Sequence, residues 1–127
     1  MAGLLVGPRL GRIIGVAVCD DRDTFVSRVR AIGRDASAFG GGPMPVLGEA
    51  WDVLESYRGP AYGVAEPSTW AAIRRMARRE GLLLDPVYTG KAFDGMLQEI
   101  AAGRVGGRVL FWHTGGCLLY TSPSPRD

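Results

Sequence analysis

The chain has 127 residues, a formal net charge of +2, and a composition that is 46% hydrophobic and 22% charged. These values indicate one globular domain or a large part of one, and such a small charge predicts no polyanion-binding surface. Two cysteines and one histidine exclude a disulfide-stapled scaffold and a structural zinc site, and no apolar run approaches the roughly 18 residues of a membrane span.

The first half of the chain predicts a helix, a strand and a second helix. Residues 1–10 open on an apolar stretch without a cap, which indicates a helix entered midway. Residues 12–19 form a nearly continuous apolar run that is rich in β-branched residues, as is typical of a buried strand of a parallel sheet. Asp23 or Thr24 is expected to cap the next helix. One face of that helix is expected to carry Phe25, Val26, Val29 and Ile32.

The glycine-rich run at residues 40–43 predicts a break in the secondary structure. Apolar and polar residues alternate weakly over residues 51–57, which is compatible with an edge strand. Pro67 suits the first turn of a helix, and Gly81 suits its end. The core face of this helix is expected to carry Trp70, Ile73, Met76 and Ala77.

The last third predicts a strand, a turn, a helix and another strand. Residues 82–84 are expected to form a short buried strand or extended segment, and residues 85–90 a turn. A helix is expected over residues 91–102, before Gly103, with a buried strand at residues 108–112. The core of that helix is expected to contain Phe93, Met96, Leu97 and Ile100.

Strands and helices alternate, which predicts an α/β fold with a three-layer, open parallel sheet. Ligands of such sheets bind outside the carboxyl ends of the strands. The segments at residues 85–90 and 113–116 both follow predicted strands. The candidate site is therefore expected in these two loops.

Four stretches, in order, resemble the D-cysteine desulfhydrase and 1-aminocyclopropane-1-carboxylate deaminase family of pyridoxal-phosphate (PLP) enzymes. They are AGLLVG at residues 2–7, AYGV at 61–64, EGLLLDPVYTGKA at 80–92 and VLFWHTGG at 109–116. The third is the most specific. The resemblance implies the large domain of a fold-type II, tryptophan synthase β-like enzyme, with PLP as cofactor, a small amino acid as substrate and a homodimeric, cytoplasmic parent.

The resemblance also implies roles for individual residues. Tyr88 corresponds to a tyrosine beside the cofactor that moves protons at the substrate, and Tyr62 to a second tyrosine that orients the substrate. Thr114 corresponds to the residue that hydrogen-bonds the pyridine nitrogen of PLP, in a cofactor loop that includes Gly115. Thr89 is expected to shape the substrate pocket. Each tyrosine could instead simply pack in a loop.

The deaminases of this family carry glutamate where Thr89 stands and leucine where Thr114 stands. Threonine at both positions is the desulfhydrase pattern. We therefore expect α,β-elimination of D-cysteine to pyruvate, hydrogen sulfide and ammonia. The sister deaminase activity and a non-enzymatic α/β binding module remain open.

Three further residue groups have two interpretations each. Lys91, the only lysine, is expected to be structural, because the Schiff-base lysine of the family lies in a portion upstream of this sequence. His113 is expected to fix its loop rather than to catalyse. The arginines at residues 74–79 are expected to form a solvated helix face rather than a nucleic-acid surface.

The resemblance covers residues 1–116 and implies a C-terminal portion of the enzyme that is inactive alone, since the family's glycine-rich phosphate loop and Schiff-base lysine are not in the sequence. Residues 117–127 read CLLYTSPSPRD. This string resembles the translation of a sequencing adapter, so we expect a non-native tail there.

Overall fold

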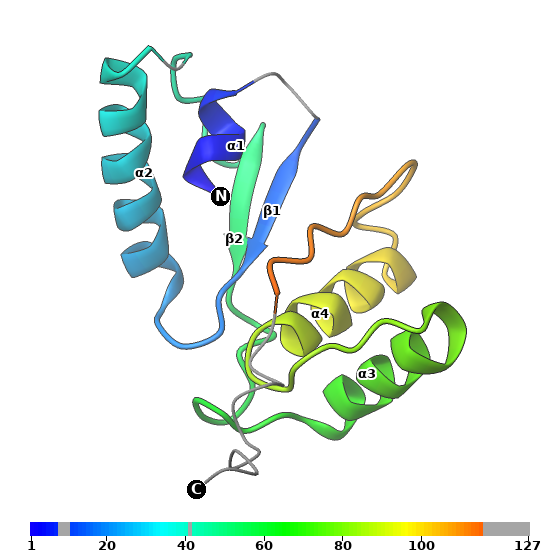
Figure 1. The fold of residues 1–127 in the computed structure, drawn as a ribbon. Coiled ribbons are helices and arrows are strands. Elements are labelled where there is room, and N and C mark those ends of the chain that lie inside the picture. The colour runs from blue at the N-terminus through cyan, green and yellow to red at the C-terminus, as the bar shows by residue number, and fades with distance from the viewer. Residues whose placement is uncertain (8–10, 41, 116–127) are drawn as a thin grey trace, which may run out of the picture. The chain divides into compact units, whose positions relative to one another are not determined.

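The computed structural model describes residues 1–7, 11–40 and 42–115 (Figure 1). The chain divides into two compact units, Met1–Glu55 and Ser56–Asp127. Gly116 and the expected tail at residues 117–127 lie outside the described residues.

The first unit is a β-α-β arrangement preceded by a short helix. Its elements are α1 (Ala2–Val6), β1 (Ile13–Val16), α2 (Arg22–Ala38) and β2 (Trp51–Leu54). The two strands pair in parallel, with Ile13 opposite Trp51 and Val16 opposite Leu54. The parallel sheet confirms the expected α/β class, and β1 and β2 lie within the two segments predicted as strands.

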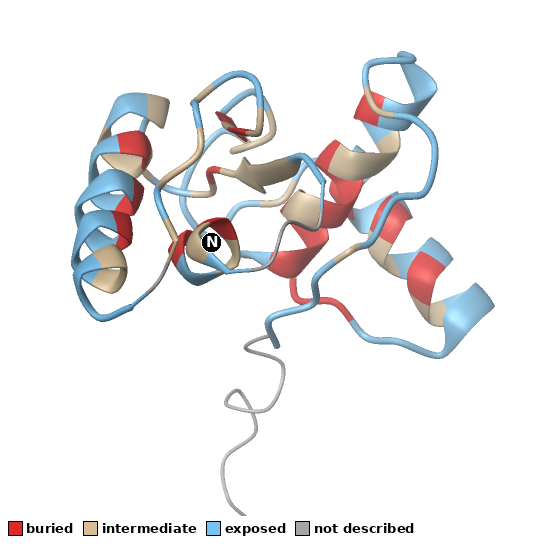
Figure 2. Ribbon diagram, turned by 90° about the horizontal axis from the view of Figure 1, so that it is seen from above, coloured by how far each residue is buried: buried red, intermediate tan, exposed pale blue. Residues whose placement is uncertain are grey.

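The core of the first unit forms where α1 and α2 pack on each other and α2 packs on β2. The buried positions of α2 follow one side of the helix (Figure 2). Trp51 is 1% exposed, and its indole N–H donates to the Pro45 carbonyl over 2.9 Å, so its polar atom is satisfied. The buried hydrophobic residues are Ala2, Leu5, Ala17, Val26, Val29, Trp51 and Val53.

Two expectations for α2 are wrong. The cap is Asp21, whose carboxylate accepts the Thr24 backbone N–H over 2.7 Å, so the helix begins earlier than expected. Ile32 is 58% exposed, whereas Gly33 is buried. At about 100° per residue, position 33 lies between the directions of Val26 and Val29, and position 32 lies well to one side.

Polar contacts join the start of α2 to β2. The Arg22 guanidinium lies 2.6 Å from the Asp52 carboxylate, and the Arg22 backbone N–H donates to Glu55 over 2.8 Å. Burial raises the pKa of Asp52, but the hydrogen bonds from Arg22 and from the Val53 N–H outweigh it and hold that pKa below its usual value. The crossover helix is therefore tied to its second strand by charge as well as by apolar packing.

The second unit is built on a pair of helices, α3 (Pro67–Glu80) and α4 (Thr89–Ala101), which pack against each other. Pro67 occupies the first turn of α3, and Gly81 ends the helix in the left-handed region at φ 67°, as predicted. Phe111 meets Phe93 edge-on with ring centroids 5.2 Å apart. The buried hydrophobic residues are Ala72, Met76, Leu84 and Phe93.

The strand predicted at residues 108–112 is not formed, because sheet pairing among the described residues is confined to β1 and β2. For residues 82–84 the sequence predicts a short buried strand or an extended segment, and of these two the strand is not formed. Leu82 and Leu83 are exposed and only Leu84 is buried. In the second segment Leu110 is 75% exposed. An apolar run becomes a strand only where a neighbouring strand takes its backbone hydrogen bonds.

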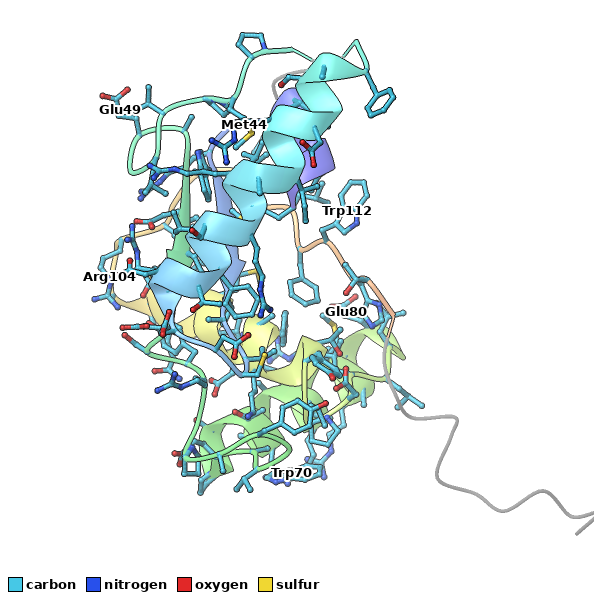
Figure 3. All side chains as sticks on the ribbon, turned by 90° about the vertical axis from the view of Figure 1, so that its left-hand side faces the viewer. Met44, Glu49, Trp70, Glu80, Arg104 and Trp112 are labelled. Carbon is cyan, nitrogen blue, oxygen red and sulfur yellow. The ribbon has the colours of Figure 1, made fainter. Side chains whose placement is uncertain are left out.

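Two expectations about helix faces and one about a helix start need correction. Trp70 is 44% exposed, because Thr69 and Ala72 occupy the buried positions of α3, and Ile100 is 41% exposed at the end of α4. The exposed rings of Trp70 and Trp112 are labelled in Figure 3. The helix predicted from residue 91 begins two residues earlier, at Thr89.

The glycine at the start of α4 generates a stability prediction. A Cβ at position 90 would lie 2.5 Å from the Asp85 carbonyl oxygen and 2.8 Å from Ile73 Cδ1. Gly90→Ala should therefore lower the free energy of unfolding by about 1–3 kcal/mol, despite the better helix propensity of alanine. Urea unfolding followed by circular dichroism measures this. Gly3→Ala in α1 is the control, since nothing lies within 4 Å of its Cβ; equal stability of the two variants would contradict the packing argument.

Candidate active site

The turn at residues 85–88 is organised by one buried carboxylate. Asp85 is 0% exposed. It accepts the backbone N–H groups of Val87, Tyr88 and Thr89 over 2.9, 2.6 and 3.0 Å. The Thr89 hydroxyl donates to the same carboxylate over 2.5 Å and accepts the Asp85 N–H over 3.0 Å. Asp85 therefore both closes the turn and satisfies N–H groups at the start of α4.

These hydrogen bonds decide the charge of Asp85. Burial raises its pKa, but the bonds from the Thr89 hydroxyl and from the N–H groups of Thr89, Tyr88 and Val87 outweigh burial and hold the pKa below its usual value. The carboxylate is thus ionised at neutral pH. Thr89 is 3% exposed, and its hydroxyl is occupied by Asp85.

The structure brings Tyr62 and Tyr88 together from segments 26 residues apart. Their hydroxyls are hydrogen-bonded to each other, and their rings meet edge-on with centroids 6.1 Å apart and planes at 66°. Tyr88 is the N-cap residue of α4, whereas Tyr62 lies in a loop. Both side chains reach solvent, with exposed fractions of 62% for Tyr62 and 36% for Tyr88. The pair presents two phenol groups at one accessible place.

The single lysine has a buried ammonium group. Lys91 is 1% exposed, and its Nζ donates to the Arg58 carbonyl over 2.7 Å and to the Ala61 carbonyl over 3.1 Å. An amine engaged in this way is not available to form a covalent bond with a cofactor at the surface. The contacts agree with the structural role expected for Lys91.

The segment at residues 113–115 is connected to the Asp85 turn through His113. The Gly115 N–H donates to His113 Nδ1 over 3.0 Å, so Nδ1 carries no proton. Nε2 is 3.4 Å from the Leu83 carbonyl, two residues before Asp85. These contacts agree with a loop-fixing role for His113. Thr114 and Gly115 are both exposed, and Gly115 has φ 92°, where a side chain would be strained.

Two buried acidic side chains on α4 are important to the fold and were missed in the sequence. Asp94 accepts hydrogen bonds from Ser68, Thr69 and Gln98, which ties α4 to the first turn of α3. Glu99 accepts the Tyr57 hydroxyl over 2.5 Å and bonds the Arg104 guanidinium over 2.9 Å. The hydrogen bond to Glu99, together with burial, raises the pKa of Tyr57. Their spacing on the helix carried no signal that distinguished them from solvated charges.

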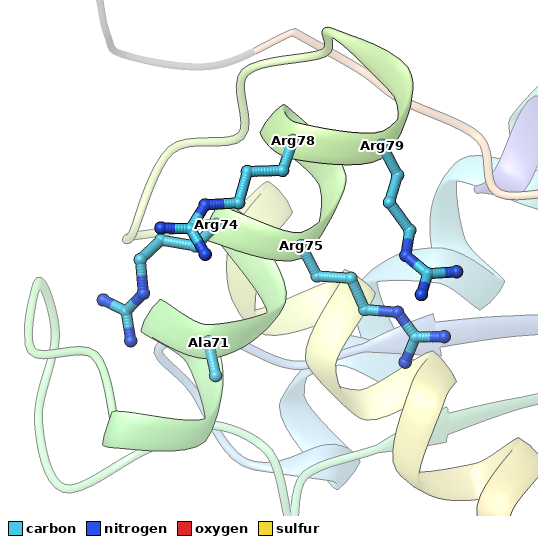
Figure 4. Close-up of a pocket in the computed structure, with 5 residues that line it drawn as sticks. All are labelled: Ala71, Arg74, Arg75, Arg78 and Arg79. Carbon is cyan, nitrogen blue, oxygen red and sulfur yellow. The ribbon is translucent and has the colours of Figure 1, made fainter.

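The arginine face of α3 is solvent-exposed, as expected. Arg74 and Arg78 extend in one direction from the helix, and Arg75 and Arg79 in another (Figure 4). They line a shallow hollow with Ala71. This face lies on a different side of α3 from the buried Met76, which belongs to the core.

The family profile described as pyridoxal-phosphate dependent enzyme matches residues 6–115. The chain is 36% identical over 122 residues to a 1-aminocyclopropane-1-carboxylate deaminase of Burkholderia ambifaria, covering 91% of this chain and 36% of the relative. It is 34% identical to a putative 1-aminocyclopropane-1-carboxylate deaminase of Pyrococcus horikoshii, covering 90% of this chain and 36% of the relative. Thus it spans about a third of the length of these relatives.

A solved structure described as an ACC deaminase homologue superposes with a TM-score of 0.72 at 33% identity, covering 82% of this chain and 31% of that one. The fold is therefore that of the fold-type II PLP-dependent enzymes. The chain belongs to the pyridoxal-phosphate dependent enzyme family. None of the helices described is both long and apolar enough to cross a membrane.

The described residues fit part of a PLP site. Thr114 offers a neutral, exposed hydroxyl of the kind that can hydrogen-bond a pyridine nitrogen, and the tyrosine pair offers accessible groups that can donate or accept a proton. Lys91 does not fit the covalent role, because its ammonium is buried on two carbonyls.

The buried carboxylate of the turn generates a prediction about acid stability. The pKa of Asp85 is lower in the folded state than the roughly 3.9 of an unfolded chain, so its stabilisation is present above that value and is lost as pH falls through the folded pKa. Asp85→Asn should lower the free energy of unfolding at pH 7 by about 1–3 kcal/mol, because the amide NH₂ cannot accept the N–H bonds. The deficit should shrink as the pH falls below about 3.9 and through the lower folded pKa.

Urea unfolding at a series of pH values measures this deficit. Asp35→Asn, which changes an exposed carboxylate on α2, is the control and should alter stability by less than about 0.5 kcal/mol. A deficit for Asp85→Asn that does not depend on pH would show that the ionised form is not the stabilising one.

Proposed function

We propose that this chain is part of a PLP-dependent lyase for a small amino acid and supplies the residues that contact the substrate and the pyridine nitrogen. The observation that carries the proposal is the hydrogen-bonded, solvent-accessible pair of Tyr62 and Tyr88. Membership of the PLP enzyme family supports an enzymatic role over the binding module considered from the sequence.

When bound, PLP supplies an electron sink for the bonds that break at the α-carbon of the substrate. The residues of this chain supply proton transfer and orientation. Tyr88 is held at the start of α4 by its N–H bond to Asp85, and its hydroxyl is hydrogen-bonded to that of Tyr62. A phenol can deliver a proton to the substrate, and a deprotonated phenol can take one from it, so the pair would serve in proton transfer. Thr114 would hydrogen-bond the ring nitrogen without adding a charge.

The first candidate substrate is 1-aminocyclopropane-1-carboxylate. It is supported by similarity to the Burkholderia deaminase, to the putative Pyrococcus deaminase and to the solved deaminase homologue. With water, this substrate would yield 2-ketobutyrate and ammonia.

The second candidate is D-cysteine, which with water would yield pyruvate, hydrogen sulfide and ammonia. It is supported by Thr89 and Thr114. The deaminases of the family that the sequence resembles carry glutamate and leucine at these two positions. In this structure the Thr89 hydroxyl is buried and hydrogen-bonded to Asp85. The names of the relatives favour the first candidate, and this residue pattern favours the second.

A product assay separates the two candidates. The complete enzyme encoded at the source locus is loaded with PLP and incubated with each amino acid separately. Ketobutyrate from the cyclopropane acid supports deamination, and sulfide with pyruvate from D-cysteine supports elimination. Turnover of neither amino acid would contradict both candidates.

The tyrosine pair generates a prediction about catalysis. Tyr88→Phe in the complete enzyme should lower kcat/KM by about 10²–10⁴-fold, the usual contribution of a general acid or base. The thermal midpoint should change little, because the hydroxyl is solvent-accessible. Tyr57→Phe is the matched control: its hydroxyl bonds the buried Glu99, so it should lower the thermal midpoint and preserve kcat/KM. The opposite pattern would exclude Tyr88 from proton transfer.

A further inference from the structure

We propose that Lys91 is a positioning residue whose buried ammonium clamps the loop before Tyr62 and thereby holds the Tyr62 hydroxyl against that of Tyr88. The inference rests on the proposed function for its catalytic consequence. The clamp itself is argued from contacts within the second unit.

The ammonium of Lys91 bonds the backbone on both sides of a tight turn. Nζ donates to the carbonyl of Arg58 over 2.7 Å and to that of Ala61 over 3.1 Å. The Ala61 carbonyl belongs to the peptide that leads directly into Tyr62, and it also accepts the Val64 N–H over 3.2 Å. One carbonyl therefore closes the turn around Tyr62 and receives the lysine. Hydrogen bonds from a charged donor are roughly twice as strong as neutral ones.

Besides the lysine, the described residues hold this loop through the contact of Tyr62 with Tyr88 and the Val64 N–H bond to Ala61. Residues 60–64 are all exposed, so burial contributes little to their conformation. Gly59 and Gly63 flank the segment with φ values of 75° and 76°, in the region where glycine is least restricted. A Cβ on Gly59 would lie 3.4 Å from Nζ and 3.0 Å from the Val64 carbonyl oxygen, so the lysine end fits closely against this turn.

The other partner of the pair is rigidly linked to Lys91. Tyr88 is the N-cap residue of α4, and Lys91 follows it by three residues, about one helical turn. The Asp85 carboxylate fixes the same turn through the Tyr88 and Thr89 N–H groups. The backbone of Lys91 therefore belongs to the same helix start as Tyr88, and its ammonium binds the loop that carries Tyr62. In this way Lys91 sets the separation of the two phenol groups.

The first test measures the loop without substrate. Hydrogen exchange is followed by mass spectrometry in the complete, PLP-loaded enzyme and in its Lys91→Met variant. Exchange in residues 58–64 should accelerate about tenfold or more, because the clamp is lost, while α3 keeps its protection. Asp94→Asn is the matched control: it alters a buried side chain of α4 that bonds Ser68 and Thr69 on α3. It should leave exchange in residues 58–64 unchanged.

The second test asks whether Lys91 acts through Tyr62. Lys91→Met should lower kcat about tenfold or more and change KM by less than about threefold, because the lysine does not contact substrate. In a Tyr62→Phe background the same change should cost less than about twofold, since the hydroxyl it positions is gone. A general loss of stability would cost the same in both backgrounds. Lys91→Gln, which retains a neutral donor, should give a smaller effect and replaces Lys91→Met if that variant does not fold.

The outcomes separate this inference from the proposed function. Unchanged exchange in residues 58–64, or equal losses of kcat in both backgrounds, would overturn the inference. Unaltered turnover in Tyr62→Phe would overturn the proposed role of the tyrosine pair and the catalytic part of the inference. The exchange measurement would still decide whether Lys91 holds the loop.

Discussion

The buried carboxylate of Asp85 receives hydrogen bonds from three consecutive N–H groups and from the Thr89 hydroxyl. A buried charge is tolerated only where such donors compensate for the water it has lost. The turn, the start of α4 and the place of Tyr88 all depend on this one group. Because its donors belong to the residues that follow it directly, the site is built on the rigid end of a helix.

The second tyrosine is held in a different way. Tyr62 belongs to an exposed loop with glycines on both sides, and its contact with Tyr88 depends on interactions that cross 26 residues or more of sequence. Lys91 supplies the bond between helix and loop. Tyr88 is thus fixed at the start of a helix and Tyr62 lies in a loop that contacts it, and both side chains reach solvent.

Family membership and a TM-score of 0.72 establish the fold and the cofactor class. The contacts place the Lys91 ammonium on a backbone carbonyl, the Thr89 hydroxyl on Asp85 and the Gly115 N–H on His113.

The sequence by itself determined the features whose causes lie within a few residues. Pro67 and Gly81 bound α3, and the residues 85–90 were predicted as a turn before a helix, since backbone sterics and local hydrogen bonds act over one helical turn or less. The family resemblance singled out both tyrosines, but no local pattern placed them in contact.

Tertiary structure alone decided the rest. The apolar segments at 82–84 and 108–112 lack a pairing strand among the described residues and form no strand. Lys91 reaches carbonyls 30 and 33 residues away, and Asp94 and Glu99 are buried by groups distant in sequence. Strand pairing, the burial of these acidic side chains and the contacts of Lys91 all depend on which segments, distant in sequence, pack next to each other. No short stretch of the sequence specifies those neighbours.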